Sequence, residues 1–103
     1  MIGIIGAGAI GWAFAFQAVR ARREAVLANS GGPHSLAGAV AALRAGIRAG
    51  TAAEAAAAPI VVFTLPWLAA RRGRRTGVWD GRVVVDPTNP IDLRDLSVVD
   101  LAA

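Results

Sequence analysis

The chain has 103 residues, a net charge of +4 at pH 7, and 55% hydrophobic against 17% charged residues. This balance excludes an intrinsically disordered chain, and the length allows one small domain, which we expect to span residues 1–103. The lack of cysteine excludes a disulfide scaffold and a thiolate metal site, and the single histidine argues against a histidine-based one, so we expect no metal.

The first half of the chain alternates between short apolar runs and helical segments. Residues 2–5 form a continuous apolar run that predicts a strand buried on both faces, and residues 9–23 predict a helix. A second strand is expected at residues 26–29, a second helix from Pro33 to residue 44, and a weak third strand at residues 46–48. Thr51 and Glu54 are spaced as a capping box at the start of a helix that ends at Pro59.

The second half of the chain begins with the strongest strand signal, at residues 60–65, which Pro66 terminates. A short helix is expected at residues 67–75 and a fifth strand at residues 82–86, while residues 91–103 form a tail of uncertain structure. Strands and helices in this rhythm predict an α/β, Rossmann-like fold: an open, mostly parallel twisted sheet of about five strands with flanking helices.

The first 19 residues are uncharged and resemble a membrane span in their hydropathy. A signal peptide carries its positive charges before the apolar stretch, whereas here the arginines follow it, and the glycines within the stretch weaken a spanning helix. We therefore expect no membrane segment and a cytoplasmic location.

The junction of the first strand and the first helix carries a G-x-G-x-x-G motif, formed by Gly6, Ala7, Gly8, Ala9, Ile10 and Gly11. The first glycine permits a tight turn, the second lets the backbone approach a pyrophosphate, and the third lets the helix pack closely on the strand. The free amides and the positive dipole end of the helix would then face the phosphates. The motif predicts a dinucleotide-binding site, and the alternative is that these small residues only ease packing at the turn.

The end of the second strand is where such sites distinguish NAD from NADP. NAD-preferring sites usually have a carboxylate there to accept the ribose 2′-hydroxyl, but this chain has Asn29 and Ser30. Neither side chain repels a 2′-phosphate, and both can donate hydrogen bonds to one. NADP is therefore expected in preference to NAD, unless the two residues only form the turn into the next helix.

Several segments of the chain resemble the NADPH-dependent reductases of the deazaflavin coenzyme F-420. They span residues 1 to about 91 and are the opening residues 1–11, Ala28-Asn29-Ser30 with the following Gly32-Pro33 and Ser35-Leu36, Leu65-Pro66-Trp67, and Asp86-Pro87-Thr88-Asn89-Pro90. The resemblance implies hydride transfer between NADP(H) and F-420 or a related redox partner. Such a transfer needs little acid or base chemistry from side chains, so no catalytic side chain is expected.

The resemblance also implies a role for individual residues in binding the cofactor. By position, the contacts would be Ala7–Ile10 to the pyrophosphate, Ser30 to the 2′-phosphate, Leu65 and Pro66 to the adenosine side or ribose, and Asn89 with Pro90 near the nicotinamide. The chain departs from the family at Gly31, where the family usually has an arginine that grips the 2′-phosphate, and at Trp12, which is bulky where the family tends to have a small residue.

Two other functions stay open on the sequence. The C-terminal portion that completes the deazaflavin site in this family has no counterpart here, so a non-catalytic dinucleotide-binding module or a truncated fragment without the substrate half is the alternative. An arginine-rich run is flanked by Trp67 and Trp79 and consists of Arg71, Arg72, Arg74 and Arg75. Such a run allows contact with nucleic acid. Runs of this kind usually form exposed basic faces, however, and we do not expect nucleic acid as a partner.

The fifth strand would be an open edge of the sheet. Unpaired edges invite association with another strand. We therefore expect either a homodimer or an edge covered by residues 91–103.

Overall fold

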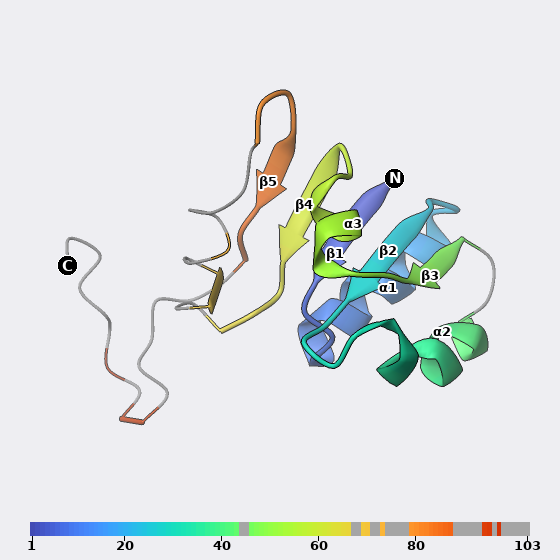
Figure 1. Ribbon diagram of the computed structural model, residues 1–103, viewed down its shortest axis with the longest axis horizontal. Helices are drawn as coiled ribbons and strands as arrows, with labels where there is room; N and C mark the ends of the chain where they lie inside the picture. The colour runs from blue at the N-terminus through green and yellow to red at the C-terminus, as the bar shows by residue number, and fades with distance from the viewer. Residues whose placement is uncertain are drawn as a thin grey trace.

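The computed structural model describes residues 1–43, 46–66, 69–70, 73, 79–87, 94–95 and 97. A five-stranded sheet in the order β3-β2-β1-β4-β5 forms the centre of the molecule, and every pair of neighbouring strands is parallel (Figure 1). The strands are β1 (Ile2–Ile5), β2 (Ala25–Ala28), β3 (Ile47–Ala49), β4 (Ile60–Phe63) and β5 (Val83–Val85). The expected Rossmann-like α/β fold is confirmed.

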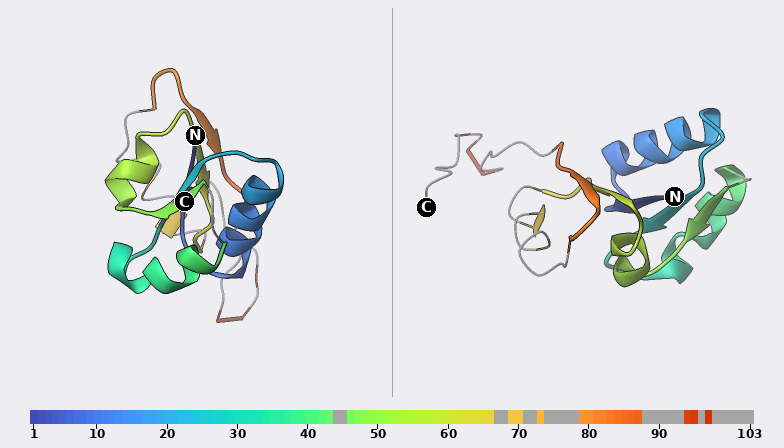
Figure 2. Two further views of the ribbon diagram at one scale, coloured as in Figure 1. Left: turned by 90° about the vertical axis from the view of Figure 1, so that its right-hand side faces the viewer. Right: turned by 90° about the horizontal axis from the view of Figure 1, so that it is seen from above.

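The helices lie in the connections between the strands. They are α1 (Ala9–Arg20), a 3-10 helix (Pro33–Ser35), α2 (Ala37–Leu43) and α3 (Ala52–Ala56). In both views of Figure 2, α1 and α3 lie on opposite sides of the sheet. Of the helix expected at residues 67–75, the described residues 69–70 and 73 are helical, and the rest lie outside the described part of the chain.

Three predicted helix boundaries differ from the structure, among them the end of the helix expected to reach Pro59, which is α3 and ends at Ala56. The first helix ends at Arg20 because Arg22 adopts a left-handed conformation, with a φ of 57°, and the amide of Arg23 donates to the carbonyl of Ala18 at 2.9 Å. This is the Schellman pattern, which usually carries glycine at the left-handed position and was therefore not visible here. The segment beginning at Pro33 forms a turn of 3-10 helix before α2 starts at Ala37.

The largest core cluster lies under α1. Ile4, Leu27 and Ile47 of three adjacent strands are buried there, together with Ala15 and Ala18 of α1. The alanines present little volume, so α1 can lie close to the sheet. Leu36, which directly precedes α2, and Val40 within α2 belong to the same cluster.

Two smaller clusters complete the core. Ala55 of α3 is buried against Val26 and Ala28 of β2. Phe63 is buried with Val61 and Ala70, and Trp79 packs edge-on against the Phe63 ring, with the ring centroids 5.5 Å apart. Burial of a phenylalanine side chain contributes about 1.5–3 kcal/mol, so this contact anchors the chain between β4 and β5.

None of the helices in the described part of the chain combines the length and the apolar character that a membrane span requires. The membrane-like hydropathy of residues 1–19 is divided between a buried strand and the amphipathic start of α1.

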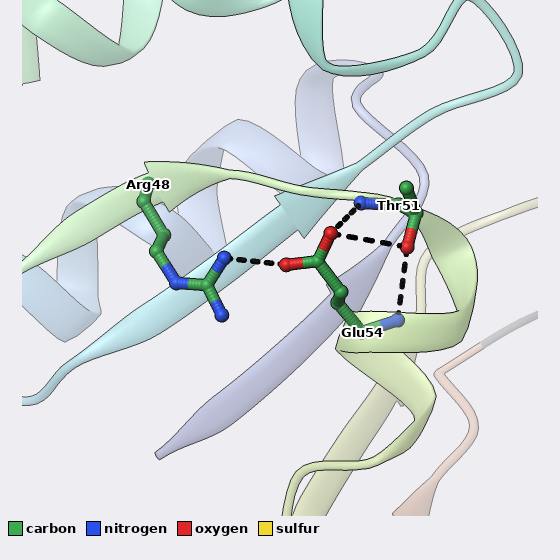
Figure 3. A network of polar contacts seen from close by, with 3 residues as sticks. All are labelled: Arg48, Thr51 and Glu54. Atoms are coloured by element: carbon green, nitrogen blue, oxygen red, sulfur yellow. Dashed lines mark hydrogen bonds and ion pairs between the residues drawn. The ribbon is translucent and has the colours of Figure 1, made fainter.

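The predicted capping box joins β3 to α3 (Figure 3). The Thr51 hydroxyl accepts a hydrogen bond from the Glu54 amide at 3.1 Å, and Glu54 Oε1 accepts one from the Thr51 amide at 3.3 Å. Glu54 Oε2 also lies 2.6 Å from Nη1 of Arg48 on β3. The Arg48 guanidinium, followed by the Thr51 amide, lowers the pKa of Glu54 below its ordinary value of 4.5.

We expect Glu54→Gln to reduce the acid sensitivity of the fold. Because the pKa of Glu54 is lowered on folding, its contribution to stability is complete above the unfolded-state pKa, ordinarily 4.5, and is lost as the pH falls through the lower folded-state value. The difference in free energy of unfolding between wild type and E54Q, measured by urea titration, should therefore be largest near neutral pH and shrink in acid. Glu24→Gln is the control for the loss of one carboxylate, and a difference that is constant with pH would contradict the account.

Candidate functional site

A candidate binding cavity lies where the strand order reverses. The chain runs outward from β1 through β2 and β3 and then returns to β4 on the other side of β1. In open α/β sheets, such a reversal separates the loops at the carboxyl ends of the strands and creates a crevice for ligands. An open cavity of about 360 Å³ lies there, lined by Gly8, Ala9, Ile10, Phe63, Thr64, Leu65, Pro66 and Pro87.

The glycine-rich turn is tied to the strands on both sides of β1. Gly6 has a φ of 113°, which only glycine adopts without strain. Its amide donates to the carbonyl of Ala28 on β2 at 2.8 Å, and its carbonyl accepts from the Thr64 hydroxyl, after β4, at 2.7 Å. Both backbone polar groups of Gly6 are therefore hydrogen-bonded, and these bonds hold the turn in place.

The other two glycines of the motif have different surroundings. A Cβ at Gly11 would lie 2.0 Å from the Gly6 carbonyl oxygen, so only glycine lets α1 approach the turn this closely. A Cβ at Gly8 would meet no heavy atom within 4 Å, and Gly8 is exposed. The first and third glycines thus shape the backbone, while the second borders open space.

The first turn of α1 offers unpaired backbone donors to this space. Gly8 is the N-cap, no side chain caps the helix, and the first turn has no acidic residue. The intrahelical hydrogen bonds begin with the Trp12 amide, which donates to the Gly8 carbonyl at 3.0 Å. The amides of Ala9, Ile10 and Gly11 precede it and have no acceptor within the helix, and they lie at the positive end of its dipole.

Trp12 does not close this opening. Its half-buried side chain packs against the core cluster under α1, which contains Ile4 and Ala15. The bulky residue that departs from the family pattern is therefore directed into the protein rather than over Gly8.

The loop after β2 is held by a serine. The Ser35 hydroxyl lies 3.0 Å from Asn29 Oδ1 and 2.7 Å from the Gly32 carbonyl oxygen, so its one proton is shared between two acceptors. Asn29 is half-buried and Ser30 is exposed. With its oxygen facing Ser35, the Asn29 carboxamide keeps its nitrogen for other partners. The loop, residues 29–35, contains no carboxylate.

The cavity brings together some of the sequence-predicted residues and leaves out others. Gly8, Ala9, Ile10, Leu65 and Pro66 line it. Asn29 and Ser30 follow the neighbouring strand β2 and are not part of its lining. Asn89 and Pro90 lie outside the described residues, as do Trp67 and the four arginines of the predicted basic run.

Sequence reasoning missed Thr64 and the role of Ser35. Thr64 Oγ1 contacts the carbonyl oxygens of both Ile5 and Gly6, at 3.2 and 2.7 Å. The available signal was a lone hydroxyl residue directly after the apolar run of β4, at the edge where the ligand crevice was expected. Nothing in the spacing of Asn29 and Ser35 indicates that their side chains meet.

The electrostatics of the cavity come from the backbone. Among the described residues that line it, none has an ionisable side chain, and the hydroxyl of Thr64 is already directed to backbone carbonyls. Within the described ranges, no group of three or more His, Cys, Asp or Glu could hold a metal ion. The described part of the cavity therefore offers apolar walls beside a row of backbone amides.

Fold and turn together define a Rossmann-like domain with a glycine-rich junction between its first strand and helix. The family described as NADP oxidoreductase, coenzyme F-420-dependent, matches residues 1–90, and the chain belongs to this family. The chain is also similar to the crystal structure of a hypothetical protein from Sinorhizobium meliloti, with 34% sequence identity and a TM-score of 0.84. The match covers 100% of this chain and 52% of the other, so this chain spans about half the length of that relative. No curated protein matches the chain.

Gly11→Ala and Gly38→Ala form a matched pair that tests the close approach of α1. The added methyl at position 11 meets the Gly6 carbonyl, whereas the one at the exposed Gly38, on α2, meets nothing within 4 Å. We expect Gly11→Ala to lower the free energy of unfolding by about 1–3 kcal/mol through overpacking. Gly38→Ala should leave it unchanged or raise it by about 0.4–1 kcal/mol. Urea unfolding measures both, and equal stabilities would contradict the packing argument.

Proposed function

We propose that this chain binds NADP(H) at the glycine-rich turn and serves hydride transfer between the nicotinamide and coenzyme F-420 or a related redox partner. The observation that carries the proposal is the uncapped start of α1, which opens onto the cavity at the strand-order reversal. Membership in the coenzyme F-420-dependent NADP oxidoreductase family supports the choice of cofactor and partner.

The pyrophosphate would be held by the backbone of Ala7–Ile10. Gly8 borders open space, so the phosphates can approach the chain there without meeting a side chain. The free amides of the first helical turn supply hydrogen bonds, and the helix dipole offsets the negative charge. Gly6 binds no ligand in this account but keeps the turn in shape, and Gly11 also keeps the turn in shape while its amide stays among the free donors.

The ribose 2′-phosphate would be bound at the carboxyl end of β2. The amide nitrogen of Asn29 and the hydroxyl of Ser30 are the donors, and no carboxylate in residues 29–35 opposes the phosphate. Leu65 and Pro66 would contact the adenosine side or the ribose across the cavity. By family resemblance, Asn89 and Pro90 would lie near the nicotinamide.

The nicotinamide supplies the hydride chemistry, so the task of the protein is to hold and align the ring. The apolar wall formed by Ile10, Leu65 and Pro66 suits that task because it excludes water without offering a competing proton donor. The buried Phe63 also lines the cavity.

A second candidate is a non-catalytic dinucleotide-binding module. It is favoured by the described lining of the cavity, which offers backbone amides and apolar walls for binding. Absorbance at the F-420 band, recorded after mixing NADPH with oxidised F-420 and this chain, separates the two. Turnover by the chain alone eliminates the module, and binding without turnover eliminates the reductase.

Calorimetric titration with NADPH and NADH tests the cofactor. We expect NADPH to bind more tightly than NADH, because the 2′-phosphate gains donors at Asn29 and Ser30. Gly8→Asp should abolish the binding of both NADPH and NADH, because it places a negative charge where the pyrophosphate would lie. Gly38→Asp introduces the same charge on α2 and is the control. If the wild-type chain binds neither cofactor at millimolar concentration, the proposal is contradicted. Equal affinities for NADPH and NADH would contradict the proposed preference for NADP.

Gly31→Arg should strengthen NADPH binding selectively. A guanidinium at this position would add a charge-assisted contact to the 2′-phosphate, worth about 1.5–3 kcal/mol or roughly 10-fold to 150-fold in Kd. The new Cβ would lie 2.9 Å from the Ser35 hydroxyl oxygen and 3.2 Å from the Ser35 Cβ, so the loop must shift by a few tenths of an ångström to accept it. Gly31→Gln controls for side-chain bulk. A similar gain for NADH, or no gain for NADPH, would show that this loop does not face the 2′-phosphate.

A further inference from the structure

The Asn29 carboxamide is not needed to close the turn after β2. The backbone closes this turn, because the Gly32 amide donates to the Asn29 carbonyl at 3.3 Å. An asparagine in a turn commonly uses its side-chain oxygen to accept from the backbone two residues further on. Here the side-chain oxygen lies 3.0 Å from the Ser35 hydroxyl instead. The direction of the carboxamide is therefore set by Ser35 rather than by the local turn.

Ser35 is carried by a stiff segment of the loop. Pro33 fixes one backbone angle at the start of the 3-10 helix. The Ser35 amide donates to the Gly32 carbonyl at 3.2 Å, and the Leu36 amide donates to the Pro33 carbonyl at 3.1 Å. Leu36 is 5% exposed and belongs to the core cluster under α1. The backbone that presents the Ser35 hydroxyl is thus anchored in the core.

Asn29 is tied through its neighbour to the glycine-rich turn. Ala28, the last residue of β2, is buried, and its carbonyl accepts from the Gly6 amide at 2.8 Å. Asn29 follows directly and is half-buried. The carboxamide therefore extends from backbone that is fixed to the proposed pyrophosphate site, and its oxygen ends at the Ser35 hydroxyl.

One hydroxyl proton decides which end of the carboxamide is left for a ligand. The Ser35 hydroxyl oxygen lies 3.0 Å from Asn29 Oδ1 and 2.7 Å from the Gly32 carbonyl oxygen. Since the Ser35 amide also donates to that carbonyl, the proton can go to Asn29 without leaving the carbonyl unpaired. The carboxamide then presents its NH2 group, which has two donors and, within the described ranges, no acceptor.

The side chains at the proposed 2′-phosphate position are neutral. Residues 29–35 contain no carboxylate, lysine or arginine, and their one ionisable residue is the exposed His34. Recognition of the phosphate at Asn29 and Ser30 therefore depends on neutral donors. A carboxamide attracts a phosphate with its NH2 end and repels it with its oxygen end, so its orientation decides the sign of its contribution.

We propose that Ser35 is a positioning residue that determines cofactor specificity. Its hydroxyl holds the oxygen of the Asn29 carboxamide, keeps the nitrogen toward the ribose 2′-phosphate, and thereby sets the preference for NADP over NAD. Ser35 touches no ligand in this account and acts through Asn29. The inference rests on the proposed function, because it needs a dinucleotide at the glycine-rich turn.

Calorimetric titration of Ser35→Ala and Ser35→Thr with NADPH and NADH tests the inference. Removal of the hydroxyl frees the carboxamide to reverse. We therefore expect Ser35→Ala to weaken NADPH binding by about 2-fold to 10-fold, the range of one hydrogen bond, and to leave NADH binding unchanged. Ser35→Thr keeps the hydroxyl and should keep the wild-type ratio of the two dissociation constants. Binding of NADH by both variants shows that they are folded.

A second background separates positioning from other roles of Ser35. In Asn29→Ala there is no carboxamide to orient, so adding Ser35→Ala should not change the ratio of the NADPH and NADH dissociation constants further. A direct contact between the Ser35 hydroxyl and the phosphate would change this ratio equally in both backgrounds. The four chains form a double-mutant cycle, which isolates the coupling of the two side chains.

The Asn29 side-chain amide gives a spectroscopic readout of the same orientation. In the 15N-labelled wild-type chain, we expect NADPH to shift the NH2 resonances of Asn29 and NADH to leave them nearly unchanged, because only the 2′-phosphate accepts from this group. In Ser35→Ala the shift caused by NADPH should be smaller.

The inference and the proposed function fail in different ways. If Ser35→Ala binds both cofactors with the wild-type ratio, or changes the ratio equally in the Asn29→Ala background, the inference is contradicted and the proposed function stands. If the wild-type chain binds neither cofactor, the proposed function itself is contradicted.

Discussion

The Gly6 peptide is the point on which the site depends. Its amide and carbonyl are bound to β2 and to the residue after β4, so it ties the ends of three adjacent strands together at the reversal of strand order. Since α1 begins at Ala9, three residues after Gly6, and packs against the turn through Gly11, the direction of the helix follows from the same constraint. The residues Gly8, Ala9 and Ile10 at the start of the helix therefore line the cavity.

In this site, the residues that fix the backbone differ for the most part from the groups that are available to a ligand. Gly6 and Thr64 fix the backbone with polar groups that are bound to internal partners, and Gly11 fixes it through its lack of a side chain while its amide has no acceptor within the helix. The groups left for a ligand are mainly backbone amides, and the surrounding side chains are apolar. Such a site would bind the negative charge of a ligand with backbone dipoles rather than with charged side chains. This arrangement suits a cofactor that carries its own reactivity.

Much of the fold could be predicted because its signals are local. The apolar run of β1, the capping box at Thr51 and Glu54, and the glycine motif each depend on a few consecutive residues and are found where expected. The strand β4 begins at Ile60 as expected but ends at Phe63 rather than at Leu65. What escaped prediction depends on contacts between distant segments. The Thr64 hydroxyl meets a carbonyl 58 positions earlier, and Gly3 is needed because the backbone of Ala55 lies where its Cβ would be. The end of α1 escaped because an arginine adopts the conformation that usually requires glycine.

The central claim is that the free amides at the start of α1 hold a diphosphate, and amide chemical shifts test it most directly. NADPH added to the 15N-labelled chain should shift the resonances of Gly8, Ala9, Ile10 and Gly11 most strongly, and inorganic pyrophosphate alone should shift the same group to a smaller extent. Shifts confined to other segments, with these four resonances unmoved at saturating NADPH, would contradict the account.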